Sequence, residues 1–374
     1  MVKLILPGFV SGGEILMEER LKKLMESLPE GMDGALLLAP VHRRYYLGIV
    51  SSAGTLLVTR HKSYFIVDFR YIEMARERIS GAEVILQDNL EEQLRCLIAD
   101  LGLRRIGTDV CHITLQCFRE YQRIIGSSLI SDISLEEAIN MQRRIKTAEE
   151  IVKAKKAKEI LDRVYDRIIP YIRPGIRDDE LQRRLGILAS EEGSQRGSFG
   201  FWISFGNNFM ESDSLPDHIL SGKCLKEGDM LSLRLASLYE GYWADMSRTV
   251  CTGSASAQQK HLYEQAFGVQ ESIINYLKPG AKLSDIAEAA EEEAVGEGIL
   301  LSDVFGHGIG METEEGIRLK KGTAETVDSG LLLCVGCRIG IPGKESVNIK
   351  DMVIVDDDGA YLLGKGCGSL LKEV

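Results

Sequence analysis

Short apolar runs separated by turn residues fill the chain from Asp33 to about Gly107. One segment between them, RYIEMARERI at 70–79, instead repeats its apolar residues at helical spacing. Short apolar runs alternating with a helical pattern are typical of an α/β domain. We therefore predict a helix at 70–79 and strands at 34–40, 55–60, 63–69 and 82–88.

Longer helices are predicted further along the chain. Thr147 and Glu150 have the spacing of a capping box, in which the two side chains satisfy free backbone N–H groups at the start of a helix. Apolar residues then recur at helical spacing to about Ile169. Further amphipathic patterns lie at 178–192, 255–277 and 283–298, so helix pairs alternate with blocks of predicted strands.

Length and composition predict a soluble protein with two domains. The chain has 374 residues, of which 44% are hydrophobic and 27% charged. The segment NMQRRIKTAEE at 140–150 precedes the first long helix, so we predict domains at 1–140 and 141–374. No apolar run approaches the roughly 20 residues that a membrane helix needs. We expect no membrane partner.

Charge and the N-terminal residues point to the cytoplasm. The formal net charge is −11, and basic residues are interspersed with acidic ones, so a nucleic-acid partner is not expected. The first ten residues, MVKLILPGFV, are interrupted by Pro7 and Gly8 and lack the cleavage pattern of a secretory signal. We expect a cytoplasmic protein.

The eight cysteines lie in apolar contexts, which is typical of reduced, buried thiols. Cys334 and Cys337 form a C-x-x-C motif on a predicted strand. A redox motif normally lies at the start of a helix beside a βαβ unit. We therefore predict that these two cysteines belong to the core.

Four blocks of sequence carry a resemblance to a known family. They are GDMLSLRLASLYEGYWADMSRT at 228–249, FGHGIGMETEE at 305–315, the strand pair at 330–355, and VHRRYYLGIVSSAG at 41–54 followed by VDFRY at 67–71. In these blocks the chain resembles the creatinase, prolidase and aminopeptidase P family. The resemblance implies a mixed α/β fold, with a creatinase-like N-terminal α/β domain followed by a pita-bread domain. It also implies a homodimer.

The metal ligands of that family fall on five positions of this chain. The resemblance places two Asp, one His and two Glu, which together hold two metal ions, at Arg234, Asp245, His307, Gly336 and Lys350. Only Asp245 and His307 match in residue type. With the histidine neutral, the formal charge of these positions is +1 instead of the four negative charges of the family set. Because an arginine stays protonated, we expect no dinuclear metal site and no cofactor.

Other positions that the resemblance assigns to substrate contacts have changed as well. The family's second His in the block at 305–315 falls on Glu314, and another falls at about Ser212. His218 is either an exposed loop histidine or a replacement for the lost one.

The glycine-rich segments at 206–208 and 306–310 lack the spacing of a phosphate-binding loop, and no Ser-His-Asp order is evident.

The two cations have two interpretations. In the first, Arg234 pairs with Asp245 and Lys350 pairs with Glu314, so that the old metal site is filled. In the second, Arg234 or Lys350 binds the carboxylate or phosphate of a ligand, with Ser212 and His218 as further contacts. Candidate catalytic residues are His307, Glu314 and Asp245.

These interpretations lead to four functional hypotheses. The first is a peptidase-like protein without peptidase activity, which binds a small carboxylate or a peptide end in the former active-site cleft. The second is a metal-independent C–N hydrolase or lyase resembling creatinase, with His307 as general acid and base and Glu314 or Asp245 orienting it. The others are an active Xaa-Pro peptidase and a protein-binding module like those of some histone chaperones.

Overall fold

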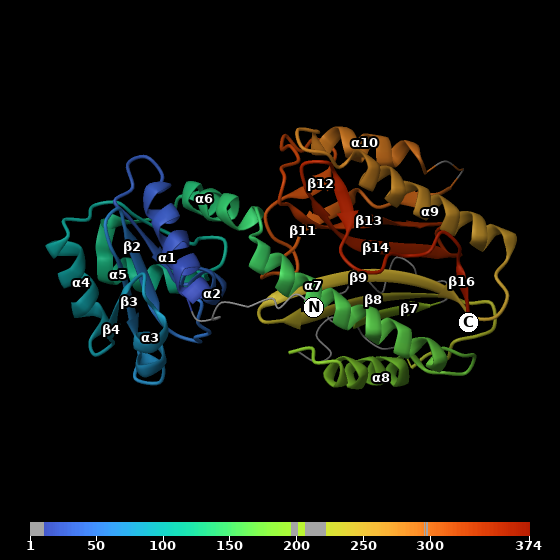
Figure 1. The fold of residues 1–374 in the computed structure, drawn as a ribbon, viewed down its shortest axis with the longest axis horizontal. Coiled ribbons are helices and arrows are strands. Elements are labelled where there is room, and N and C mark those ends of the chain that lie inside the picture. The colour runs from blue at the N-terminus through green and yellow to red at the C-terminus, as the bar shows by residue number, and fades with distance from the viewer. Residues whose placement is uncertain (1–10, 196–200, 206–221, 295, 297) are drawn as a thin grey trace, which may run out of the picture. The chain divides into compact units, whose positions relative to one another are not determined.

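The computed structural model describes residues 11–195, 201–205, 222–294, 296 and 298–374. It divides into two compact units, Met1–Gln142 and Arg143–Val374. Figure 1 shows the N-terminal unit in blue and green and the C-terminal unit in green to red.

The N-terminal unit is a six-stranded sheet with helices around it. The strand order is β4-β3-β2-β1-β5-β6. Its strands are β1 (Gly34–Leu37), β2 (Thr55–Thr59), β3 (Ser63–Val67), β4 (Glu83–Leu86), β5 (Ile106–Thr108) and β6 (Leu129–Ile130). Its helices are α1 (Ser11–Glu26), α2 (Pro40–Leu47), α3 (Ile72–Arg78), α4 (Leu90–Asp100), α5 (Leu115–Ile125), the short η1 (Gly126–Ser128) and α6 (Ile133–Arg144). The predicted α/β character is confirmed.

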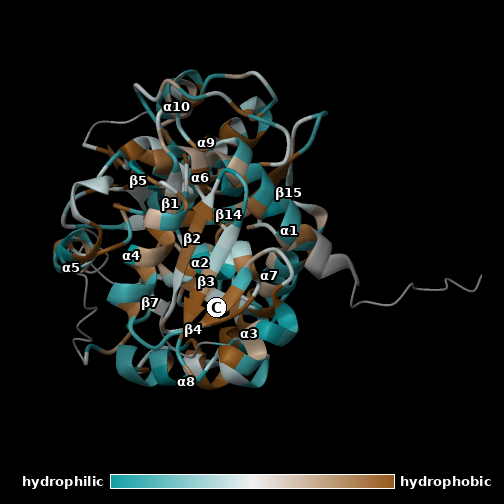
Figure 2. Ribbon diagram, turned by 90° about the vertical axis from the view of Figure 1, so that its left-hand side faces the viewer, coloured by the Kyte–Doolittle hydropathy of each residue, from teal (hydrophilic) through white to brown (hydrophobic). Residues whose placement is uncertain are grey.

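The central strands of this sheet are buried and mostly apolar. β1, β2 and β3 pair antiparallel, whereas β4, β5 and β6 join in parallel. Every residue of β1, β2 and β3 is buried, as expected for strands covered on both faces. Figure 2 shows β2 and β3 as hydrophobic strands among helices that carry hydrophilic positions.

The C-terminal unit repeats a helix pair followed by strands. Its helices are α7 (Ala148–Ile168), the short η2 (Ile169–Tyr171), α8 (Asp178–Glu191), α9 (Ala257–Tyr276) and α10 (Leu283–Glu292). The predicted capping box of α7 is confirmed, with Thr147 as N-cap and Glu150 as its partner. α10 ends at Glu292, before the predicted limit of 298, because Gly296 and Gly298 follow and glycine disfavours helix.

A ten-stranded sheet forms the centre of this unit. Its main order is β12-β11-β13-β14-β9-β8-β7, with β10 on β13, β15 on β14 and β16 on β9. The longer strands are β8 (Met230–Tyr239), β9 (Tyr242–Cys251), β13 (Leu332–Gly340) and β14 (Ser346–Val355). The shorter ones are β7 (Phe201–Phe205), β10 (Leu300–Leu301), β11 (Val304–Gly308), β12 (Arg318–Lys320), β15 (Ala360–Leu362) and β16 (Lys372–Glu373).

Both helix pairs pack on the same face of this sheet. Every second residue of β8 belongs to a buried cluster shared with α7 and α8, namely Leu231, Leu233 and Leu235. Val335 of β13 and Ile349 of β14 share another with α9 and α10 (Figure 1). Successive side chains of a strand point to opposite faces. The residues between these apolar ones, including Arg234 and Lys350, therefore point to the opposite face of the sheet.

The C-x-x-C motif belongs to the core, as predicted. Cys334 and Cys337 are free, fully buried thiols on β13. No helix among the described residues is long and apolar enough to cross a membrane.

Candidate functional site

Strand register aligns the predicted site positions in a row across the C-terminal sheet. Gly336 on β13 pairs with Lys350 on β14. Lys350 pairs with Ser247 on β9, and Ser247 pairs with Arg234 on β8. Paired residues of neighbouring strands point to the same face. Three of the five positions thus lie in one row, with Ser247 between Lys350 and Arg234, although more than 100 residues separate Arg234 from Gly336 in sequence.

The other two positions join the same face from neighbouring places. Asp245 lies two residues before Ser247, so both side chains point the same way. His307 on β11 pairs with Cys334 on β13, two residues before Gly336. The register therefore gathers all five positions on one face of the sheet, with Cys334 among them.

Arg234 and Asp245 form a close ion pair. Arg234 Nη2 lies 2.9 Å from Asp245 Oδ2, and Nε lies 3.3 Å from the same oxygen. The attraction of Asp245 raises the pKa of Arg234. Burial raises the pKa of Asp245, but the guanidinium outweighs burial and the pKa is lowered. The guanidinium also lies 4.8 Å from the centre of the Trp202 ring. The predicted pair of Arg234 and Asp245 is confirmed.

Gly336 has no room for a side chain. A Cβ atom built on it lies 2.0 Å from the carbonyl oxygen of Ile349 and 2.8 Å from the Cα of Lys350. Its φ is +154°, which L side chains rarely adopt. A larger residue requires β13 and β14 to move apart at this point.

His307 is buried in its neutral form. Its Nδ1 lies 3.2 Å from the carbonyl oxygen of Gly308, and Nε2 has no hydrogen-bond partner among the described residues. Burial and then the charge of Lys350 lower the pKa of His307. An imidazole with a free Nε2 can accept a proton or contact a ligand.

Cys334 adds a donor that the sequence analysis placed only in the core. Its Sγ lies 3.6 Å from the carbonyl oxygen of Asp245, and burial raises the pKa of the thiol. Asp245, His307 and Cys334 each offer one ligand atom, and these atoms lie within 4.8 Å of one another. The sequence signal was the position of Cys334 two residues before Gly336, on the same strand face.

Glu314 does not pair with Lys350, so this prediction is wrong. Glu314 Oε2 accepts a hydrogen bond of 3.0 Å from Arg318 Nη2, and its side chain is 44% exposed. Arg318 is four residues away on the adjacent strand β12, which makes a local pair easier to form than one with Lys350. Among the described residues, no carboxylate lies within ion-pair distance of Lys350.

The neighbouring Glu315 anchors the glycine-rich segment, a role that the sequence did not reveal. Its carboxylate lies 2.5 Å from Arg143 Nη2 and 2.6 Å from Lys146 Nζ, and all three side chains are buried. A Cβ on Gly310 lies 2.2 Å from Glu315 Oε1. The absence of a side chain at Gly310 thus permits this close packing.

Comparison with protein families identifies the fold. Residues 152–357, more than half of the chain, match the model of metallopeptidase family M24. Residues 19–145 match the creatinase/prolidase N-terminal domain. The chain belongs to metallopeptidase family M24. The predicted creatinase-like N-terminal domain followed by a pita-bread domain is confirmed.

Relatives in this M24 family align over nearly the whole chain. The uncharacterized peptidase YqhT of Bacillus subtilis is 29% identical over 344 residues, which cover 91% of this chain and 95% of YqhT. The Xaa-Pro dipeptidase of Pyrococcus furiosus is 27% identical over 354 residues, or 93% and 98% of the two chains. The structure of the Xaa-Pro dipeptidase from Bacillus anthracis superimposes with a TM-score of 0.86 at 27% identity, covering 96% of this M24 chain and 100% of the other.

Two predicted site residues cannot be placed. Ser212 and His218 lie outside the described residues, as do the glycine-rich segment at 206–208 and the first ten residues.

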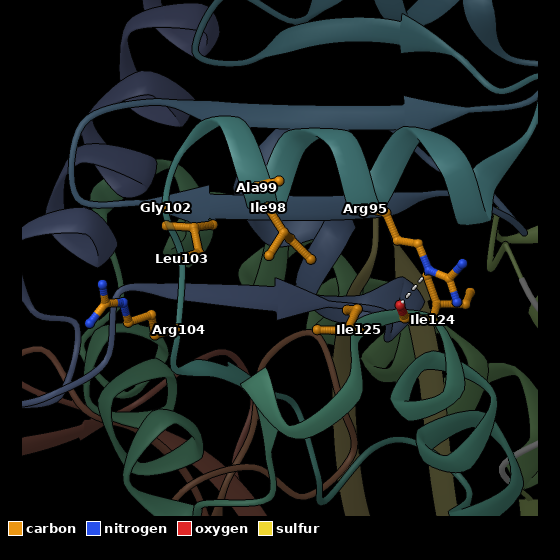
Figure 3. Close-up of a pocket in the computed structure, with 8 residues that line it drawn as sticks. All are labelled: Arg95, Ile98, Ala99, Gly102, Leu103, Arg104, Ile124 and Ile125. Atoms are coloured by element: carbon orange, nitrogen blue, oxygen red, sulfur yellow. Dashed lines mark hydrogen bonds between the residues drawn. The ribbon is translucent and has the colours of Figure 1, made fainter.

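A pocket on the N-terminal unit of this M24 protein, between α4 and α5, contains none of the predicted residues (Figure 3). There Arg95 Nε donates to the carbonyl oxygen of Ile124 over 3.0 Å, which satisfies part of its guanidinium.

Proposed function

We propose that this chain is an M24-fold protein without a dinuclear metal centre, and that the former metal site binds the carboxylate of a small molecule or of a peptide end. The observation that carries the proposal is the ion pair of Arg234 with Asp245, whose side chain is 1% exposed. The resemblance implies that the family's aspartate at this position binds metal. Here a guanidinium that cannot lose its proton holds that carboxylate.

Charge and space both argue against two metal ions at this site. Two divalent ions need several anionic oxygen ligands, whereas Arg234 and Lys350 repel cations. Gly336 stands at a position that the resemblance assigns to a glutamate ligand, yet a Cβ there meets the Ile349 carbonyl oxygen at 2.0 Å. These features favour a site that has been rebuilt around positive charge.

A single ion held by Asp245, His307 and Cys334 is disfavoured as well. The oxygens of Asp245 already accept hydrogen bonds from Arg234. A cysteine binds metal as its thiolate, but burial raises the pKa of Cys334 and keeps the proton on sulfur. These three residues therefore do not suit a metal ion.

An anionic ligand suits the charge that remains. The five positions sum to +1 with His307 neutral, so one carboxylate brings the local charge to zero. Arg234 retains a 25% exposed side chain, and Lys350 is partly buried beside it in the same row of the sheet. A guanidinium and an ammonium that converge in a partly desolvated site bind carboxylates strongly.

The test is a calorimetric titration of the full chain with small guanidino acids, betaine-like acids and dipeptides. We expect one of these classes to bind, and Lys350→Met to weaken its binding at least tenfold. Lys344→Met is the matched control, because Lys344 is exposed on the hairpin between β13 and β14. Hydrolysis of Xaa-Pro dipeptides after incubation with manganese, lost in Asp245→Asn, contradicts the proposal.

A second function is favoured by the free Nε2 of buried His307. A metal-independent C–N hydrolase resembling creatinase requires a general acid and base, and His307 is placed for this role with Asp245 beside it. Glu314, which pairs with Arg318, no longer supports the orienting role considered for it. Product formation from a guanidino acid, abolished by His307→Gln while binding persists, separates this enzyme from a pure binding protein.

A homodimer and a cytoplasmic location stay predictions from the sequence. Sedimentation of the purified chain tests the first, and cell fractionation tests the second.

A further inference from the structure

Three side chains with metal-binding atoms meet inside the N-terminal unit, apart from the site on the C-terminal sheet. His42 comes from α2, His112 from the segment after β5, and Glu136 from α6. His42 is 0% exposed and Glu136 is 1% exposed. One ligand atom of each lies within 4.8 Å of the other two. No sequence motif marks these residues as a site.

The geometry of the cluster leaves a gap between His42 and Glu136. His112 Nδ1 lies 2.9 Å from Glu136 Oε1, and His42 Nε2 lies 3.7 Å from the same oxygen. The centres of the two imidazole rings are 4.4 Å apart. Among the described residues, neither His42 Nε2 nor Glu136 Oε2 has a hydrogen-bond partner. Buried polar atoms without partners are rare in native proteins and call for a physical reason.

Asp109 fixes the orientation of His42. Its Oδ2 accepts from His42 Nδ1 over 3.1 Å and from the backbone N–H of Ala39 over 2.7 Å, at the start of α2. The backbone N–H of Leu38 also donates to Asp109, over 3.1 Å to Oδ1 and 3.0 Å to Oδ2. Burial raises the pKa of Asp109, but the hydrogen bond from His42 and those from the backbone outweigh it and lower the pKa. Asp109 is therefore an acceptor, and Nδ1 of His42 carries the hydrogen. In the neutral ring, Nε2 then presents a bare lone pair to the carboxylate of Glu136.

Two lone pairs that face each other across 3.7 Å repel unless a cation lies between them. A hydrogen bond is shorter, at about 2.7–3.2 Å. Two ligands on one tetrahedral zinc ion, each about 2.1 Å from it, lie roughly 3.4 Å apart. The observed separations of 2.9 and 3.7 Å bracket this value.

We propose that His42 Nε2, His112 Nδ1 and the Glu136 carboxylate bind one divalent transition-metal ion of the zinc and cobalt class, with Asp109 as a positioning residue. Two imidazoles and one carboxylate are a known zinc ligand set, and a carboxylate behind a ligating histidine is its usual support. His112 is 21% exposed, so water reaches the fourth position from that side. The ion links α2, the segment after β5 and α6.

The experiment starts from the full chain, stripped with a chelator and titrated with Zn²⁺ or Co²⁺ alone. Elemental mass spectrometry after desalting is expected to give about one ion per chain. The visible spectrum of the cobalt form is expected to lack a thiolate band, which separates this cluster from the group that contains Cys334. Because the ion binds the folded state, it also raises the melting temperature.

Variants assign the ion to its residues. His112→Ala and Glu136→Gln should each weaken binding at least tenfold, and Asp109→Asn by about 10- to 100-fold, with folding checked by circular dichroism. His261→Ala, at a histidine whose side chain is 70% exposed, is the matched control and should change nothing. His307→Gln, in the C-terminal unit, should also retain the ion.

Each outcome is decisive. An ion lost in His112→Ala and kept in His307→Gln supports the inference. A wild-type chain that binds no ion at micromolar concentration overturns it and leaves the proposed function untouched. An ion that shows a thiolate band and is lost in His307→Gln overturns it as well, and in that case the proposed metal-free site on the C-terminal sheet fails too.

Discussion

Removing the guanidinium of Arg234 should destabilise the C-terminal unit strongly. In Arg234→Met the Asp245 carboxylate, 1% exposed, loses the partner at 2.9 Å that compensates its burial. Leaving one partner of a buried pair uncompensated typically costs about 3–5 kcal/mol. Lys350 and His307 also lower the pKa of Asp245 and offset part of this penalty. We therefore expect a loss of about 3 kcal/mol at neutral pH.

The asymmetry of the pair provides the control. Asp245→Asn leaves Arg234, whose side chain is 25% exposed and can reach water. Its effect should be smaller, about 1–2 kcal/mol, because solvated charges need less compensation. The double variant buries no charge at this point and should be more stable than Arg234→Met, so the double-mutant cycle gives a coupling energy of about 1–3 kcal/mol.

The dependence on pH has a definite sign. In the wild type the folded pKa of Asp245 is lowered, so its contribution is present above the unfolded value of about 3.9 and is lost as the pH falls through the folded pKa. In Arg234→Met only Lys350 and His307 still oppose the effect of burial, so the folded pKa of Asp245 is higher than in the wild type. In mildly acidic solution Asp245 of the variant is then protonated, which removes the cost of its buried charge. The difference in the free energy of unfolding between variant and wild type therefore shrinks as the pH falls.

Tryptophan fluorescence during urea unfolding measures this effect in the right place. The chain has 2 tryptophans, Trp202 and Trp243, and both belong to the C-terminal unit. With a slope of about 3 kcal/mol per molar urea, a loss of about 3 kcal/mol moves the midpoint by about 1 M. A variant within about 0.5 kcal/mol of the wild type at neutral pH refutes the claim that Arg234 compensates a buried carboxylate.

Three further predictions concern single residues. Gly336→Ala should cost more than about 1 kcal/mol, as measured by urea unfolding, because its Cβ lies 2.0 Å from a carbonyl oxygen, and an unchanged midpoint contradicts this. Lys146 and Arg143 outweigh the effect of burial and lower the pKa of Glu315. The carboxylate therefore stabilises the fold above about pH 4.3, and this contribution is lost in acid. In Glu315→Gln the free energy of unfolding should fall less steeply than in the wild type as the pH is lowered. Thr147→Ala removes the cap of α7 and should cost about 1 kcal/mol, whereas Thr147→Ser should cost little.

Local patterns predicted several helices and strands, and the resemblance to the family supplied the positions of the candidate site. The capping box at Thr147 and the helical spacing along α7 depend on neighbours within a few residues, and those neighbours are read directly from the sequence. Arg234 and Asp245 are eleven residues apart, on two strands joined by a tight hairpin, so their pairing could be predicted from the sequence. The end of α10 was misjudged because periodicity continued past two glycines.

Contacts between distant segments were decided only by the tertiary structure. Glu314 forms an ion pair with Arg318 instead of Lys350, because pairing with a residue only four positions away costs little conformational entropy. Cys334 joins His307 through the pairing of β11 with β13. The cluster of His42, His112 and Glu136 draws on three elements spread over 95 residues, from 42 to 136.

The sequence by itself determined the resemblance to the family and, through it, the exchange of carboxylates for cations at the five matched positions, because those motifs are continuous in sequence. Only the tertiary structure decided which charges meet, how closely β13 approaches β14 at Gly336, and which buried atoms lack partners. Those properties depend on distances of a few tenths of an ångström between segments remote in sequence, and no local pattern encodes them.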